Sequence, residues 1–214
     1  MEAAVDKPKF TAAEMGQALT LLDAELSKSK NIQRVSPVKI ISYGGFVGVT
    51  HLQSYPLTES IEYILDPAIL DKEKIRVKLQ RGVKAVAEKH TLPIDWMNSR
   101  VELLAVGDSI FPLFGESEQQ NVALFRGKNI IVYAAEWKWS LAHKLKRYGS
   151  ELKSVDLLDA VAITKVLVPE MKAEPLSRAW LRDLNKIVHT PIEEHVIDRV
   201  AYEFEQIHRY TGIS

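Results

Sequence analysis

A short run of β-branched residues, 38–43, stops abruptly at Gly44-Gly45. β-branched side chains favour strands, and a glycine pair favours a tight turn whose backbone other residues adopt only with strain. A second run, 60–65, alternates polar and apolar side chains, which is typical of a strand with one buried face. The two runs predict neighbouring strands of one sheet, connected through a glycine turn.

Helical spacing of apolar residues surrounds these strands. Thr11 and Glu14 form the pattern of a capping box, which predicts a helix from residue 11 to about 29, and the same spacing predicts a helix over 74–90. The other expected elements are a short helix within 46–52, a turn and short helix over 92–98, a short strand over 101–106, a mobile loop over 107–123, a strand over 129–133, helices over 137–148 and 153–167, and two helices after residue 175, divided near residue 190. This alternation predicts an α/β (α+β) fold, in which a small mixed β-sheet is flanked by helices and followed by a C-terminal helical extension.

The composition limits the classes of function. The chain has no Cys, which excludes disulfides, thiolate metal sites and cysteine nucleophiles. Lys+Arg and Asp+Glu both number 28, so no net field attracts nucleic acid or an anionic membrane. The sequence shows no signal-peptide pattern and no apolar run of roughly 18 residues. We therefore expect a soluble, cytoplasmic protein with one domain over 11–168 and a helical extension over 175–212.

The order of helix, strand, Gly-Gly turn and alternating strand resembles the nucleotidyltransferase superfamily, in its toxin-like branch. In that branch, a strand carrying an Asp-x-Asp pattern follows the glycine pair. Further similar segments are Leu92-Pro93-Ile94-Asp95-Trp96-Met97-Asn98, Ile130 to Tyr133, Lys144-Leu145 and Asp156-Leu157-Leu158-Asp159. The shared order covers residues 15–165 and implies a nucleotidyltransferase-like domain.

The resemblance also implies chemistry at the second strand. Two carboxylates separated by one residue lie on the same face of a strand, where they can hold Mg²⁺ against a nucleoside triphosphate, while a glycine turn lets phosphate approach the backbone. In this sequence the two carboxylate positions are occupied by Ser60 and Glu62. A serine hydroxyl is a weak, neutral ligand, and glutamate is one methylene longer than aspartate, so the implied metal site is degraded.

Two more residues complete the implied site. Glu102 would supply a third carboxylate from a neighbouring strand, and the alternative is a solvated strand residue. Lys144 would contact a phosphate, or it is a solvated lysine beside Lys146 and Arg147. The candidates for catalysis and metal binding are therefore Glu62 and Glu102, and the candidates for nucleotide binding are Gly44, Gly45, Ser60 and Lys144. The glycine pair has its own alternative, a turn with no ligand.

Three functions fit these patterns. The first is a degenerate nucleotidyltransferase-fold protein, catalytically impaired, that binds a nucleoside triphosphate, another small ligand or a protein partner. The alternative is an active, divergent Mg²⁺-dependent nucleotidyltransferase that transfers a nucleotide to a hydroxyl acceptor, with Glu59 or Asp66 as an added metal ligand. The third is an interaction protein whose C-terminal apolar stripe docks on its own domain or forms a homodimer; the stripe consists of Val196, Val200, Phe204 and Ile207. No cofactor is assigned, except Mg²⁺ if the chain is active.

Overall fold

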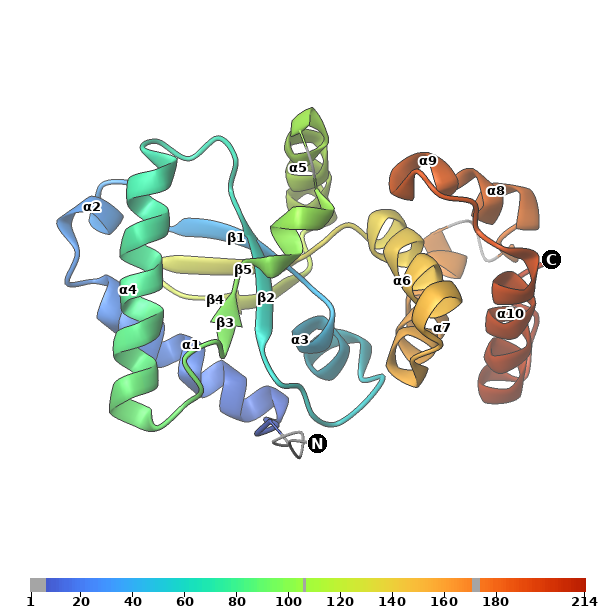
Figure 1. The fold of residues 1–214 in the computed structure, drawn as a ribbon, viewed down its shortest axis with the longest axis horizontal. Coiled ribbons are helices and arrows are strands. Elements are labelled where there is room, and N and C mark those ends of the chain that lie inside the picture. The colour runs from blue at the N-terminus through green and yellow to red at the C-terminus, as the bar shows by residue number, and fades with distance from the viewer. Residues whose placement is uncertain (1–6, 106, 171–173) are drawn as a thin grey trace, which may run out of the picture. The chain divides into compact units, whose positions relative to one another are not determined.

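The structure is a computed structural model that describes residues 7–105, 107–170 and 174–214 (Figure 1). The chain divides into two compact units. One unit contains the residues up to His51 together with Pro56–Ala135, and the other contains Leu52–Tyr55 together with Glu136–Ser214. No helix among the described residues is long and apolar enough to span a bilayer.

A five-stranded mixed sheet forms the centre of the first unit. Its strands, in spatial order, are β3 (Met97–Asn98), β2 (Ile61–Leu65), β1 (Val38–Tyr43), β5 (Ile130–Ala134) and β4 (Ala123–Arg126). β1 pairs antiparallel with β2 and parallel with β5. The two strands expected to be neighbours therefore lie side by side, and the expected mixed sheet flanked by helices is confirmed.

Local sequence explains why β1 is central. Every β1 side chain except Lys39 is buried, as expected for a strand that is paired and covered on both faces.

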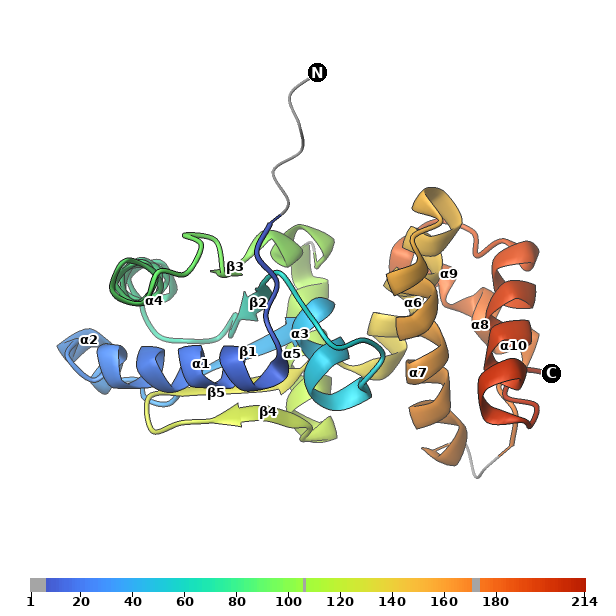
Figure 2. The ribbon, with the colours of Figure 1, turned by 90° about the horizontal axis from the view of Figure 1, so that it is seen from below.

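Helix α1 (Ala12–Leu26) begins with the predicted capping box of Thr11 and Glu14. It packs against α4 (Lys72–His90), whereas α5 (Ile110–Gln120) lies on the opposite side of the sheet from α1 (Figures 1 and 2).

The connection from β1 to β2 is short and helical, as expected. Gly45–Val47 forms α3, and Gly48–Leu52 continues it as a single π-helical turn. A further short helix, α2 (Lys30–Gln33), precedes β1.

The second unit is helical. Its helices are α6 (Trp137–Glu151), α7 (Ser154–Glu170), α8 (Arg178–Asp183), α9 (Asn185–Val188) and α10 (Glu194–His208). α10 packs against α7 and α6 within this unit. Three residues of the predicted stripe, Val196, Val200 and Phe204, are buried there, whereas Ile207 remains 48% exposed. Residues 175–214 contain three helices, α8, α9 and α10, whereas two were expected.

Three expectations between β2 and β5 are wrong. Residues 101–105 do not form a strand, because Arg100–Leu104 is a 3₁₀ helix (η2) in which Val101 is buried and Leu103 is exposed; the last residue of the expected strand, 106, lies outside the described residues. Residues 107–123 are not a loop, because a 3₁₀ turn over Gly107–Ser109 leads into α5. Similarly, residues 92–98 form a turn followed by β3, without the expected short helix.

The apolar residues of α5 have helical spacing, although the composition of the segment is that of a loop. Leu113, Phe114 and Ser117 are buried at intervals of one, three and four residues, which is one face of a helix. The Gly, Ser, Glu and Gln residues around them gave the segment the composition of a loop.

Candidate functional site

The glycine turn after β1 is shaped by two requirements. Gly44 has φ 79° and ψ −132°, a conformation that favours glycine. At Gly45, a Cβ atom would lie 2.2 Å from the Thr58 hydroxyl oxygen, which leaves no room for a side chain. The space beside Gly45 is thus filled by Thr58, so close packing within the chain accounts for this glycine.

Ser60 and Glu62 lie beside this turn. The Glu62 backbone is opposite Tyr43 in the β1–β2 register, and a Glu62 carboxylate oxygen lies 3.3 Å from the position that a Gly44 Cβ would occupy. Both side chains line a hollow of about 170 Å³, which we call the small hollow; its lining residues are Lys7, Pro8, Glu59, Ser60, Glu62, Pro93, Asp95 and Arg100. The structure therefore brings together Gly44, Gly45, Ser60 and Glu62.

The charges of the small hollow do not favour phosphate. Asp95 Oδ2 accepts from Lys7 Nζ at 3.2 Å and from Arg100 Nη2 at 3.0 Å, and the hydrogen bond from Lys7 is the main cause that lowers the pKa of Asp95. Glu59 and Glu62 add two more carboxylates. Two cations and three carboxylates give a formal sum of −1, so a metal-free polyphosphate is repelled.

Glu102 lies in a different place. Its Oε1 accepts from the Leu65 backbone N–H at 3.1 Å, and its Oε2 pairs with the Arg76 guanidinium. Both carboxylate oxygens are therefore engaged at the far end of β2. Glu102 does not line the small hollow with Glu62, and it is a half-buried residue of a 3₁₀ helix instead of a strand residue.

Lys144 belongs to the second unit, where it lies in a buried polar network. Its Nζ lies 2.9 Å from Asp156 Oδ1 and 2.7 Å from Asp159 Oδ2, and the three side chains are at most 5% exposed. Ser54 Oγ and Tyr55 Oη donate to Asp159 at 2.6 and 3.1 Å. Burial, together with the neighbouring Asp159, raises the pKa of Tyr55 well above its ordinary value, so Tyr55 stays a donor. The lysine is paired with carboxylates and is not solvated.

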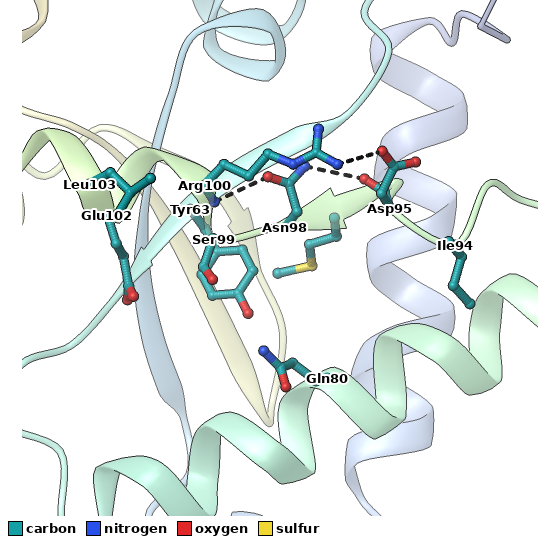
Figure 3. A pocket seen from close by; sticks show the side chains of 10 residues that line it. Tyr63, Gln80, Ile94, Asp95, Asn98, Ser99, Arg100, Glu102 and Leu103 are labelled. Carbon is teal, nitrogen blue, oxygen red and sulfur yellow. Dashed lines mark hydrogen bonds and ion pairs between the residues drawn. The ribbon is translucent and has the colours of Figure 1, made fainter.

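A larger hollow of about 480 Å³, which we call the large hollow, opens at the β3 edge of the sheet (Figure 3). It is lined by Tyr63, Gln80, Ile94, Asp95, Met97, Asn98, Ser99, Arg100, Glu102 and Leu103. Asp95 and Arg100 line both hollows. Among these residues, the sequence predicts a role only for Glu102 and a family resemblance only for the segment that contains Ile94, Asp95, Met97 and Asn98.

Comparison with known proteins gave no match to a family model, a curated protein or a solved structure. The nucleotidyltransferase resemblance therefore stays a prediction from the residues. In the part of the chain that the structure describes, no group of three or more His, Asp or Glu side chains is arranged to hold a metal ion. At the predicted metal positions, the donors that face the hollow are one hydroxyl and one carboxylate, a poor fit to Mg²⁺.

Proposed function

We propose that this chain is a nucleotidyltransferase-like protein that binds a ligand or a protein partner and does not transfer nucleotides. The observation that carries this proposal is the pair Ser60 and Glu62, which lines one hollow beside the glycine turn. The order of β1, glycine turn, short helix and antiparallel β2 supports the ancestry. The serine hydroxyl supports the loss of metal chemistry, because it replaces a charged ligand with a neutral one.

The proposed loss of catalysis follows from the charge balance. Nucleotidyl transfer needs Mg²⁺ to offset the charge of a triphosphate. One carboxylate and one hydroxyl hold Mg²⁺ weakly, and without the metal the small hollow, with a formal sum of −1, repels the triphosphate. Glu102 cannot make up the deficit, because Arg76 and the Leu65 N–H already engage its two oxygens.

A transfer assay tests this proposal. The full-length chain is incubated with labelled nucleoside triphosphates, Mg²⁺ or Mn²⁺, and RNA or protein acceptors. We expect no transfer above the level of Glu62→Gln. Glu88→Gln, a change at an exposed position of α4, serves as the matched control. Transfer that Glu62→Gln abolishes and Glu88→Gln preserves would overturn the proposal.

An active, divergent Mg²⁺-dependent nucleotidyltransferase is the second candidate, and one observation favours it. Glu59, Glu62 and Asp95 all line the small hollow, so three carboxylates border the same space. Asp95 is engaged by Lys7 and Arg100, which leaves Glu59 as the residue that would compensate for Ser60. If this candidate is correct, Glu59→Gln and Glu62→Gln each abolish Mg²⁺-dependent transfer.

A further inference from the structure

Two neighbouring segments of the first unit concentrate positive charge. Residues 28–34 and helix α4 together contain ten Lys and Arg residues but only two Asp and Glu residues, whereas the whole chain has 28 of each. α2 lies beside the N-terminal half of α4 in both views, and the two helices are in contact (Figures 1 and 2). A chain with no net charge therefore carries one strongly basic surface.

Most of these cations have no carboxylate partner. Four of the ten form ion pairs with described residues, namely Lys28, Arg76, Lys84 and Lys89. The other six form no ion pair with any described residue, and five of these six make up what we call the basic face: Lys30, Arg34, Lys74, Lys78 and Arg81. Lys78 is half-buried, and the other four are exposed. An anion can therefore bind the basic face without first taking a cation from a carboxylate.

The rotation of α4 directs its share of the basic face toward solvent. Lys74, Lys78 and Arg81 follow i, i+4, i+7 spacing, so they lie on one side of the helix. The side that is buried in the core carries Ile75, Leu79, Val83 and Val86. Gly82 packs closely against α1, because an added Cβ would lie 3.0 Å from Leu26 Cδ2. This packing holds the three cations in a fixed row at the surface.

α2 extends the row beyond α4. Lys30 and Arg34 are four residues apart, and Ile32 between them is completely buried. Because Ile32 points into the core, Lys30 and Arg34 lie on the opposite side of this short helix. The basic face therefore covers two adjacent helices and carries five unpaired positive charges.

The side chains of α2 and α4 distinguish between possible polyanions. Single-stranded nucleic acids stack their bases on aromatic side chains, and neither helix contains Phe, Tyr or Trp. An amphipathic helix binds a membrane through its apolar side, which in α4 is buried in the core. Interfaces between proteins are depleted in Lys at their centre. The partner that fits is a regular phosphate backbone, which needs only cations.

We propose that the basic face binds the phosphate backbone of a double-stranded nucleic acid without reading its sequence. Lys74 and Arg81 are separated by about 10 Å along the helix axis, a length over which a duplex carries about six charges. Contacts to phosphates position a protein on a duplex but do not select bases. This inference does not rest on the proposed function, because no residue of the basic face lines the small hollow.

Fluorescence anisotropy of the full-length chain with labelled duplex DNA and duplex RNA of equal length tests the inference. We expect binding that weakens with salt, with a slope of log K against log salt concentration of about −4.5 for duplex DNA, since each phosphate contact contributes about −0.9. Lys74→Gln/Lys78→Gln/Arg81→Gln should reduce the slope by about 2.7 and weaken binding at low salt by about tenfold or more. Lys30→Gln/Arg34→Gln, which leaves α4 unchanged, should reduce the slope by about 1.8.

A matched variant separates the basic face from a general effect of charge. Lys9→Gln/Lys138→Gln/Lys165→Gln removes the same charge from three exposed lysines outside the basic face and should keep the wild-type slope. Duplex binding that the basic-face variants weaken and this control preserves supports the inference. No duplex binding at low salt, equal weakening by the two triple variants, or binding only to single-stranded oligonucleotides or to phosphatidylserine vesicles would overturn it.

Discussion

Gly45 shows how closely the segment before β2 approaches the glycine turn. An added Cβ would lie 2.2 Å from Thr58 Oγ1 and 3.2 Å from Thr58 Cβ. We therefore expect Gly45→Ala to lower the free energy of unfolding by about 1–3 kcal/mol, through overpacking. Because Thr58→Ala removes the closest atom, Gly45→Ala should cost less in that background. Urea denaturation of the single and double variants measures both effects.

Gly16 provides the control for this prediction. Apart from the neighbouring residues and backbone of α1 itself, no atom lies within 4 Å of a Cβ added at Gly16. Gly16→Ala should therefore stabilise the chain by up to about 1 kcal/mol, since alanine is the better helix former. If Gly45→Ala destabilises the chain no more than Gly16→Ala does, Thr58 does not pack closely against Gly45 as described.

His143 is the residue from which we expect a dependence of stability on pH. It is 5% exposed, and its ring packs at a tilt against Trp139 with ring centroids 4.2 Å apart. Its pKa is lowered to about 4, mainly by burial and further by Lys146 and Arg147. The unfolded chain protonates this histidine near pH 6.5, whereas the folded chain keeps it neutral down to about pH 4. Its contribution to stability is therefore complete above pH 6.5 and is lost as the pH falls toward 4.

The size of this loss follows from the pKa difference. One pKa unit corresponds to about 1.4 kcal/mol, so the loss between pH 7 and pH 4 is roughly 3 kcal/mol. His143→Gln should remove that part of the pH dependence, which urea denaturation at several pH values can resolve. An equally steep profile in the variant would show that His143 does not titrate in this way.

At the level of elements, hydrogen bonds to the Asp23 side chain connect the β4–β5 turn to α1. The carboxylate accepts from the backbone N–H groups of Asn129 at 2.7 Å, Ile130 at 3.0 Å and Lys128 at 3.3 Å. We expect Asp23→Ala to cost about 2–4 kcal/mol of unfolding free energy, because several charge-assisted hydrogen bonds are lost together. Thermal or urea denaturation measures this loss.

Two substitutions calibrate the Asp23 prediction. Asp23→Asn keeps an acceptor oxygen and should cost less than Asp23→Ala. Asp183→Ala removes a side chain that is 67% exposed and should change stability by less than about 0.5 kcal/mol. If Asp23→Ala and Asp183→Ala change the free energy of unfolding equally, the Asp23 hydrogen bonds to the β4–β5 turn do not stabilise the fold.

The elements also show what the sequence could reveal. α1, β1 and β2 were predictable because their periodicity and capping are local patterns. The partners of Glu102 were not, since Arg76 lies 26 residues away and the Leu65 N–H lies 37 residues away. Nor could local spacing pair Ser54 with Asp159, 105 residues apart. Contacts between residues so far apart in the sequence can be identified only once the fold is known.

At the scale of the whole molecule, the residues predicted to bind a nucleotide divide between the two units. Gly44, Gly45, Ser60 and Glu62 belong to the first unit, and Lys144 belongs to the second. Within the second unit, Lys144 pairs with the two buried aspartates Asp156 and Asp159, and Arg147 Nε lies 3.5 Å from Asp156 Oδ2. Removing one partner of this network would leave an unpaired buried charge, which is strongly destabilising.

The proposed function implies that β2 and the residue before it, Ser60, descend from a metal-binding strand that has lost charge. Calorimetric titration of Mg²⁺ into the Ser60→Asp/Glu62→Asp variant tests it most directly. We expect a clear gain in Mg²⁺ affinity over the wild type, because two short carboxylates would face one hollow. Ser150→Asp/Glu151→Asp, which adds the same charge at exposed positions of α6, should show no gain. A folded Ser60→Asp/Glu62→Asp variant that binds Mg²⁺ no better than the wild type would contradict the claim.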